Sequence, residues 1–413
     1  MSSNLIITNA FIVTPLGHEA ARGAKMKELF LRKDSYIVIT DGVIEEIGLT
    51  RDFKGAPSGY EKYDAEGRVV MPGVVDSHTH LVFGGYRPDE FSWRLKGDSY
   101  MSIMERGGGI QSTVNATREE SFDRLLDKSQ WFVDRMVQTG VTTVEAKSGY
   151  GLDTATEVKM LDVINALAKK DDQKLRIVST FLGAHAVPKE YKGRTDEYCD
   201  LIINEMIPAV KGKAEFFDIF TEKNVFEIEE SKKLLEAAKK AGFKLKLHAD
   251  EIVQLGGSEL AAEVGAVSAD HLLHISDEGI RRMKEAGVVA TVLPLTAFAL
   301  KEPYAPARKM IDAGGAVALA TDLNPGSCFS GSIPLTIALS CIYMNMSIEE
   351  VITGLTLNGA AAVDMASEIG SIEKGKRGDL AVLEFDNYHF LPYYIGMNCV
   401  RTTVYNGKIV YNA

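Results

Sequence analysis

The strongest constraint on the fold is a repeated alternation of apolar runs and amphipathic stretches between residues 69 and 321. The expected strands are Val69–Asp76, Val141–Ala146, Leu175–Ala184, Glu215–Phe220, Phe243–His248, Ala266–His271, Val288–Pro294 and Ala316–Thr321. Stretches between them, such as Thr154–Lys170, Ser231–Ala241 and Ser276–Ala286, carry apolar residues at the three- and four-residue spacing of helices that cover a sheet. Eight such units predict a parallel (β/α)8 barrel of the TIM type. A doubly wound open sheet is the alternative, although no Gly-x-Gly-x-x-Gly follows an early strand.

The two ends of the chain show a different pattern. Asp41-Gly42 and Asn406-Gly407 each separate two β-rich runs, which is the strongest short signal for a hairpin. We therefore expect a small β-sandwich domain assembled from residues 1–68 and 372–413. The barrel, the expected catalytic domain, would then span residues 69–371.

Charge and cysteine content restrict the partners of this chain. Its 413 residues carry a net charge of −11 without a basic cluster, which argues against nucleic acid and anionic membranes as partners. Four cysteines lack paired spacing, as in proteins of a reducing compartment. The N-terminus lacks a signal-peptide pattern, and the longest apolar stretch, Gly287–Leu300, is shorter than the roughly 20 residues of a membrane span. These features predict a cytoplasmic protein that acts on a small molecule.

Residues suited to metal chemistry lie at the ends of the expected strands. His78 and His80 end the first strand, and residues two apart in a strand point to the same face. Two imidazoles fixed in this way form half of a zinc- or iron-type site. Other candidates at strand ends are Tyr150, His185, His248, His271 and Asp322. Because active sites of parallel barrels lie at the C-terminal ends of the strands, these side chains should meet on one rim.

Each of these residues also has a structural explanation. A histidine at a strand end can satisfy a nearby backbone group, Asp322 can cap a helix, and Tyr150 can be a core aromatic residue. Arg87 and Glu251 can be solvated loop charges. The convergence of many polar groups on one rim favours a functional site, because folding alone would leave several buried charges unexplained.

Six sequence blocks give a more specific indication. They are Phe83–Arg87, Glu105–Ile110, Glu145–Gly151, Phe181–His185, His248–Glu251 and Asp322–Gly326. With the His-x-His motif and the later histidines and aspartate, they make the whole chain similar to the amidohydrolase superfamily, and especially to its members in histidine degradation. The resemblance implies that one zinc or iron ion per subunit is bound by His78, His80, His248 and Asp322.

The resemblance also implies a reaction and a way to hold its substrate. The reaction is hydrolysis of the cyclic amide of 4-imidazolone-5-propanoate to N-formimidoyl-L-glutamate, with a metal-activated water as the nucleophile. Arg87 would bind the propanoate carboxylate, since a planar, two-pronged cation suits that group. Tyr150 and His185 would hold the ring and the side chain. The remaining substrate contacts would come from Glu251, Asn324, Gly326 and Ser327.

Three residues would transfer or direct protons in this reaction. Asp322 is the expected general base. His271 would orient the water or polarise the attacked carbonyl. The leaving ring nitrogen would take its proton from Asp322 or from Glu251.

A single metal ion is favoured over two. Relatives with two metals bridge them with a carboxylated lysine at the end of the fourth strand, and the nearby Lys223 lies past that position. Whether Glu222 or Lys223 touches the site stays open at this point. The family further implies a homodimer. The alternatives are another hydrolase of the superfamily, such as a deaminase or a hydantoinase-like enzyme, and an inactive scaffold, against which the complete ligand set argues.

Overall fold

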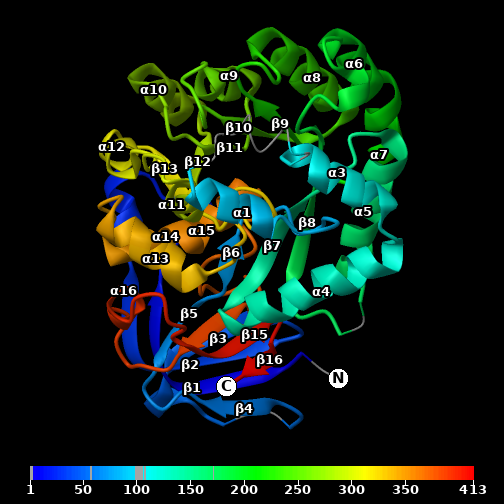
Figure 1. Cartoon of the computed structure of the whole chain (residues 1–413). Helices are drawn as coiled ribbons and strands as arrows, with labels where there is room; N and C mark the ends of the chain where they lie inside the picture. Colours follow the sequence, from blue (N-terminus) through cyan, green and yellow to red (C-terminus); the bar gives the residue numbers. More distant parts are fainter. Residues whose placement is uncertain (1–2, 56–57, 98–105, 107, 171) are drawn as a thin grey trace.

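The computed structural model describes residues 3–55, 58–97, 106, 108–170 and 172–413. A barrel surrounded by helices forms the upper part of the molecule in Figure 1, and a sheet built from both ends of the chain lies below it. The described helices include none with the length and apolar character needed to cross a membrane.

Eight parallel strands follow one another around the barrel in sequence order, as predicted. They are β6 (Val74–Asp76), β7 (Val141–Lys147), β8 (Arg176–Ala184), β9 (Phe216–Thr221), β10 (Lys244–Ala249), β11 (Ser268–His271), β12 (Val289–Val292) and β13 (Ala316–Leu319). This order differs from that of a doubly wound sheet, in which the chain returns to the middle and reverses direction.

The barrel closes just beyond the ends of its first and last strands. The backbone N–H of Asp322 donates to the carbonyl of His78 (3.0 Å), and that of His80 donates to the carbonyl of Leu323 (2.9 Å). Thr79 and Leu323 form a parallel bridge between these hydrogen bonds. Three of the predicted metal ligands, His78, His80 and Asp322, therefore lie in the segments that join β6 to β13.

A second contact between the first and last strands lies one step earlier in the chain. The buried carboxylate of Asp76 accepts hydrogen bonds from the backbone N–H of Thr321 (2.9 Å) and from its hydroxyl (2.6 Å). Side-chain and backbone hydrogen bonds thus tie the two ends of the barrel sheet together.

The first expected strand, Val69–Asp76, is divided between the two sheets. Its first part, β5 (Val69–Pro72), pairs with strands of the terminal sheet, and only β6 belongs to the barrel. The chain crosses from one sheet to the other at Gly73. A Cβ atom there would lie 2.1 Å from the hydroxyl oxygen of Thr142 on β7, so this close approach requires glycine. The expected strand was wrong in this respect, because the apolar run continues through the crossing.

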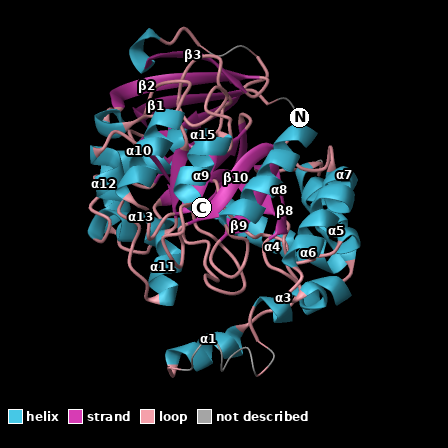
Figure 2. Cartoon of the chain, turned by 90° about the horizontal axis from the view of Figure 1, so that it is seen from above, coloured by secondary structure: helices cyan, strands magenta, loops and turns pink. Residues whose placement is uncertain are grey.

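Helices cover the outside of the barrel (Figure 2), and the helices expected at 154–170, 231–241 and 276–286 are all present. The helices before β11 are α4 (Phe122–Gln138), α5 (Thr154–Ala168), α6 (Thr195–Leu201), α7 (Ile207–Val210), α8 (Ile228–Ala241) and α9 (Gly257–Val264). Those after it are α10 (Asp277–Ala286), α11 (Pro294–Leu300), α12 (Ala307–Asp312), α13 (Ile333–Ile342), α14 (Ile348–Leu355), α15 (Leu357–Ala362) and α16 (Phe390–Tyr393). Two more, α1 (Pro88–Leu95) and α3 (Ile110–Glu119), follow β6, and α1 stands apart from the ring in Figure 2.

The terminal sheet contains strands from both ends of the chain, in the order β16-β15-β14-β5-β1-β2-β3, with β4 on β1. Its further strands are β1 (Leu5–Thr14), β2 (Phe30–Thr40), β3 (Val43–Leu49), β4 (Glu61–Asp64), β14 (Leu380–Leu383), β15 (Val400–Tyr405) and β16 (Lys408–Asn412). Both predicted hairpins are confirmed, between β2 and β3 and between β15 and β16. Alternate residues such as Leu5, Ile7, Ile37 and Ile39 share one buried cluster. The small β domain is thus a single hydrogen-bonded sheet. Side chains from strands at both of its ends share one buried apolar cluster, as the two layers of a sandwich would.

Candidate active site

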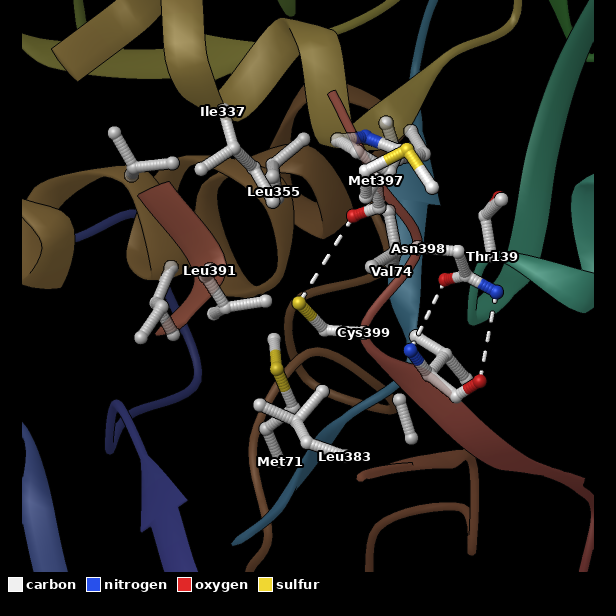
Figure 3. Close-up of a pocket in the computed structure, with 16 residues that line it drawn as sticks. Met71, Val74, Thr139, Ile337, Leu355, Leu383, Leu391, Met397, Asn398 and Cys399 are labelled. Carbon is white, nitrogen blue, oxygen red and sulfur yellow. Dashed lines mark hydrogen bonds between the residues drawn. The ribbon is translucent and has the colours of Figure 1, made fainter. Parts of the chain in front are cut away.

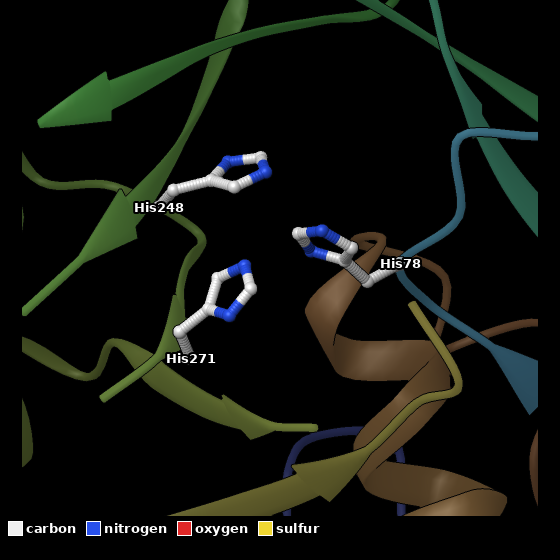
Figure 4. A group of neighbouring side chains, drawn as sticks. All are labelled: His78, His248 and His271. Atoms are coloured by element: carbon white, nitrogen blue, oxygen red, sulfur yellow. The ribbon is translucent and has the colours of Figure 1, made fainter. Parts of the chain in front are cut away.

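The four predicted metal ligands meet at the top of the barrel. Oδ1 of Asp322 lies 3.6 Å from Nε2 of His78 and 3.5 Å from Nε2 of His80. Nε2 of His248, on β10, lies 3.4 Å from Nε2 of His80. Figure 4 shows the rings of His78 and His248 beside that of His271, which ends β11. These side chains are buried, and their ligand atoms form overlapping groups of three within 4.8 Å of one another, among them His78, His80 and Asp322, and His78, His248 and His271.

Their free atoms fit a metal ion. Within the described part of the chain, Nε2 of His78 and Oδ1 of Asp322 are buried and have no hydrogen-bond partner. Buried polar atoms normally have one, and imidazole nitrogens with a carboxylate oxygen are ligands for zinc and iron. The residues therefore fit the ion that the resemblance implied, with His78, His80, His248 and Asp322 able to hold it.

Carboxylates that were not predicted orient two of these histidines. Nδ1 of His78 lies 2.6 Å from Asp270, and Nδ1 of His248 lies 3.1 Å from Asp218. A carboxylate that accepts a hydrogen bond from Nδ1–H keeps the proton on that nitrogen. The Nε2 lone pair is then free to bind a metal. Asp270 is itself 3.4 Å from the ammonium nitrogen of Lys246.

A lysine inside the barrel compensates the charge of these carboxylates. Lys147 on β7 donates to Asp218 (2.7 Å) and to Glu145 (2.8 Å), and it lies 4.0 Å from Asp270. All four side chains are fully buried. Burial opposes the ionisation of Asp218, but His248 and Lys147 overcome it and hold the pKa of Asp218 well below its usual value.

The sequence carries a signal for this network in the charged residues of its strands. Glu145, Lys147, Asp218, Lys246 and Asp270 are charged residues inside strands whose other residues are mostly apolar. A charged side chain in a buried strand requires a partner of opposite charge. These five residues therefore predict a network of ion pairs inside the barrel.

Asp322 is held by a threonine that also was not predicted. Its Oδ2 accepts a hydrogen bond from the hydroxyl of Thr296 on α11 (2.6 Å), which leaves Oδ1 facing His78 and His80. Burial raises the pKa of Asp322 to about 6, and the Thr296 hydrogen bond opposes that rise. Its backbone is left-handed, with a φ of 53°, a strain often found at functional sites. Ser332 caps the next helix, so the capping explanation for Asp322 is wrong.

Tyr150 and His185 lie beside the histidine cluster. The ring of His185 stacks on His80 with centroids 5.0 Å apart, and Tyr150 lies 5.2 Å from His185. Nδ1 of His185 is 3.0 Å from the carbonyl of Gly149, which fixes that nitrogen as the donor. Burial lowers the pKa of His185 to about 3, so the ring is neutral at pH 7 and Nε2 is an acceptor.

Arg87 lies on the loop after β6, directly against the loop after β13. A Cβ atom at Gly326 would lie 1.6 Å from Nη2 of Arg87, so a larger residue there would have to displace the guanidinium from this position. Its Nη1 is 3.5 Å from Glu90, and Arg94 donates to the carbonyl of Gly326 (3.3 Å). Only 11% of the Arg87 side chain is exposed, so its charge is directed inward rather than solvated as a loop charge.

Glu251 and His271 form a pair next to the cluster. Oε1 of Glu251 lies 3.5 Å from Nδ1 of His271. Burial and the nearby Asp322 raise the pKa of Glu251 to about 8, so its carboxyl carries a proton at neutral pH. Burial lowers the pKa of His271 well below its usual value, which keeps the ring neutral. A neutral imidazole and a protonated carboxyl can both donate a hydrogen bond to a substrate.

The structure defines the positions of Glu222 and Lys223. Glu222 is buried and accepts hydrogen bonds from the backbone N–H groups of Ile252 (2.8 Å) and Val253 (3.4 Å). It therefore holds the loop that carries Glu251. Lys223 is exposed to solvent, unlike a lysine that bridges two buried ions.

Asn324 shapes the loop that carries Gly326 and Ser327. Its side-chain oxygen accepts from the backbone N–H groups of both residues (2.8 Å each). Its amide nitrogen donates to the carbonyl of Asp322 (2.8 Å) and to the hydroxyl of Ser327 (2.9 Å). These bonds use the Asn324 side chain fully, so it fixes the loop conformation in this structure.

The apolar pocket in Figure 3 is a separate feature. Met71, Ile337, Leu383 and Cys399 are among the residues that line it, between the barrel helices and the terminal sheet. None of its described lining residues belongs to the predicted site. The predicted site residues lie instead at the opposite end of the barrel, where the strands end at their C-termini. Of the six sequence blocks, only Glu105–Ile110 includes residues outside the described part of the chain, Glu105 and Gly107.

Comparisons with known proteins agree with this geometry. The model of the amidohydrolase family matches residues 69–410. The imidazolonepropionase of Phocaeicola vulgatus is 61% identical over 100% of both chains, and that of Clostridium tetani is 55% identical over 99% of this chain and 98% of its own.

Solved structures share the fold at low sequence identity. A 5-methylcytosine deaminase from Klebsiella pneumoniae has a TM-score of 0.75 at 17% identity, covering 99% of this chain and 97% of its own. The guanine deaminase of E. coli has a TM-score of 0.71 at 15% identity, covering 98% and 99%. The resemblance seen in the sequence motifs is therefore confirmed: the chain belongs to the amidohydrolase family and, within it, to the imidazolonepropionases.

Proposed function

We propose that this chain hydrolyses 4-imidazolone-5-propanoate to N-formimidoyl-L-glutamate. The observation that carries the proposal is the placement of Arg87 against Gly326, facing inward next to a histidine–aspartate cluster. A cation at this position suits a substrate with a carboxylate side chain. The names of the relatives at 55–61% identity support the same substrate.

We assign one zinc or iron ion per subunit to His78, His80, His248 and Asp322. When bound, the ion would act as a Lewis acid that lowers the pKa of a bound water to about 7. A single ion is supported by the exposed position of Lys223, which leaves the end of β9 without a buried bridging lysine among the described residues.

The rim residues hold the substrate. Arg87 pairs with the propanoate carboxylate, and its charge is close enough to act on the pKa values of both Tyr150 and His185. Burial raises the pKa of Tyr150, so its hydroxyl stays a neutral donor. Tyr150 donates and neutral His185 accepts, which suits a ring that carries both carbonyl and N–H groups. The loop of Asn324, Gly326 and Ser327 completes the pocket, through backbone groups and the Ser327 hydroxyl.

Proton transfer is assigned to three side chains. Oδ1 of Asp322 takes a proton as the water oxygen attacks the ring carbonyl, and His271 orients the water or polarises that carbonyl. The carbon–nitrogen bond of the ring then breaks. Glu251 or Asp322 returns a proton to the leaving nitrogen, so one water is consumed and no covalent enzyme intermediate forms.

We further propose that the protein acts in the cytoplasm as a homodimer. All four cysteines are free, as expected in a reducing compartment. Exposed apolar side chains at and just beyond the ends of α13 and α16, including Tyr343, Tyr393 and Ile395, support a contact between subunits. Sedimentation of the purified protein tests the dimer.

The first experiment is turnover of freshly prepared 4-imidazolone-5-propanoate, followed by the loss of its ultraviolet absorbance, with metal analysis of the same sample. We expect stoichiometric metal and turnover that is lost in His78→Ala and strongly reduced in Arg87→Ala. Bound metal without turnover would overturn the substrate and favour another hydrolase of the family. A panel of cyclic amides and aminated bases would then identify it.

A further inference from the structure

A lysine on α4 holds the loop that ends in Arg87. Nζ of Lys128 lies 3.8 Å from the ring centroid of Phe83 and 3.7 Å from that of Tyr86. It also donates a hydrogen bond to the carbonyl of Gly85 (2.7 Å). Phe83, Gly85 and Tyr86 come directly before Arg87, so Lys128 contacts three residues of the loop from which Arg87 extends, and Thr117 accepts a hydrogen bond from the backbone N–H of Gly84 (2.8 Å) in the same loop.

The same group of rings reaches the second loop of the substrate rim. Phe329, on the loop after β13, lies 5.5 Å from Tyr86, 6.3 Å from Phe83 and 5.9 Å from Phe132 between ring centroids. We name Phe83, Tyr86, Phe132 and Phe329 the aromatic cluster. Lys128 contacts two of its rings, and the cluster joins the Arg87 loop to the loop of Gly326.

The surroundings of Lys128 are unfavourable for a residue that serves stability alone. Burial lowers the pKa of Lys128 to about 8. Among the described residues, the charge that acts on it is Glu120, which pairs with Arg124 at 3.0 Å, and no carboxylate forms an ion pair with Lys128 itself. A partly buried ammonium without a counter-ion is costly, and ring faces with one carbonyl compensate it only in part.

We propose that Lys128 is a positioning residue for recognition of the substrate carboxylate. By joining the aromatic cluster to the Gly85 carbonyl, it holds the guanidinium of Arg87 against Gly326 in the orientation that receives a carboxylate. The inference rests on the proposed function for the identity of the substrate. The link between the two loops does not depend on it.

Steady-state kinetics of Lys128→Met test the role in recognition. We expect KM for 4-imidazolone-5-propanoate to rise about tenfold, while kcat changes less than about twofold and bound metal is unchanged. Lys128→Met should have no further effect on kcat/KM in an Arg87→Ala background. Both substitutions remove the same interaction, that of Arg87 with the substrate carboxylate. The matched control is Arg135→Met, which removes a cation 3.3 Å from the Trp131 ring on the same helix and should leave KM unchanged.

Hydrogen exchange of residues 83–87 and 324–330 tests the link without substrate. Lys128→Met should speed exchange in both loops, and Lys128→Arg, which keeps the charge but not the single ammonium nitrogen, should have a smaller effect. The proposal is overturned if KM is unchanged, if kcat falls as much as KM rises, or if only one loop responds. If the unmodified enzyme does not turn over the substrate while both loops respond, the proposed function fails and the link stands. Should Lys128→Met not fold, the same comparisons apply to Lys128→Arg.

Discussion

The metal half and the substrate half of the site are held in place by different means. His78, His80 and His248 lie in or shortly after barrel strands, and carboxylates on other barrel strands orient two of them: Asp270 across the barrel from His78, and Asp218 on the strand beside His248. Arg87, Glu251 and Gly326 lie on loops. Each of those loops is held in part by a polar side chain from outside the strands: Lys128, Glu222 and Asn324, respectively.

This difference teaches where each half is vulnerable. In the metal half, the ligands and the carboxylates that orient them lie on the barrel strands or on the segments that close the barrel. Their positions are therefore as rigid as the barrel sheet itself. The substrate half can change its loops without changing the strands, which is how parallel barrels vary their specificity. Substitutions in the first half should affect metal content, and substitutions in the second should affect KM.

The largest effect should come from removing a ligand. His78→Ala takes away an imidazole and leaves Asp270 without the Nδ1–H that it faces. We expect loss of bound metal and a fall in turnover of about 1,000-fold or more, because the activated water disappears with the ion. Metal analysis with turnover on the same sample measures both. His389→Ala, on an exposed histidine of the terminal region, is the control, and a His78→Ala enzyme that keeps its metal would contradict the ligand assignment.

A smaller effect, on KM alone, should follow Gly326→Ala. The new methyl group would collide with Arg87 and displace its guanidinium. Loss of a bidentate hydrogen bond between charged groups corresponds to about 10- to 100-fold in kcat/KM. Gly331→Ala in the same loop meets only ordinary contacts, at 3.9 Å and beyond, and should keep KM. Equal effects of the two substitutions would show that the loop, not Arg87, had been disturbed.

Asp218→Asn should weaken metal binding rather than abolish it. The amide can still lie beside His248, but it no longer neutralises Lys147. Loss of such a carboxylate typically lowers metal affinity about 10- to 100-fold. Competition with a chelator measures the change, and KM measured with saturating metal should stay the same. Asp162→Asn, in a surface ion pair with Lys213, is the matched control. A change in KM without a change in affinity would break the division between the two halves.

The smallest effect should come from Thr296→Val. It removes the hydroxyl that donates to Oδ2 of Asp322 and keeps the shape of the side chain. One hydrogen bond of this kind is worth about 2- to 10-fold, expected in kcat with little change in KM. Steady-state kinetics at saturating metal measure it. Thr336→Val, whose hydroxyl bonds within its own helix, should have no effect on kcat.

The strand ends were predictable from the sequence because barrel strands are short apolar runs and the chemistry follows them. The partners across the barrel were not. Asp218 and Asp270 were visible as charges in strands, but the histidine that each orients depends on which side chains the closed barrel brings together, on the neighbouring strand for Asp218 and across the barrel for Asp270. The place of Lys128 depends on how α4 packs against a loop, and no spacing in the sequence encodes that. The split of the first strand at Gly73 was hidden because the apolar run continues through it.

The seam between the first and last barrel strands has a consequence for how the protein matures. The backbone around His78, His80 and Asp322 completes the barrel, and it joins segments that leave the ribosome at very different times. The ion's binding site therefore does not exist until the last strand docks. Ion uptake then reports a finished fold, and its binding free energy adds to that of barrel closure. A cell that runs short of the metal would accumulate chains whose barrels open more readily and which proteases can reach at this seam.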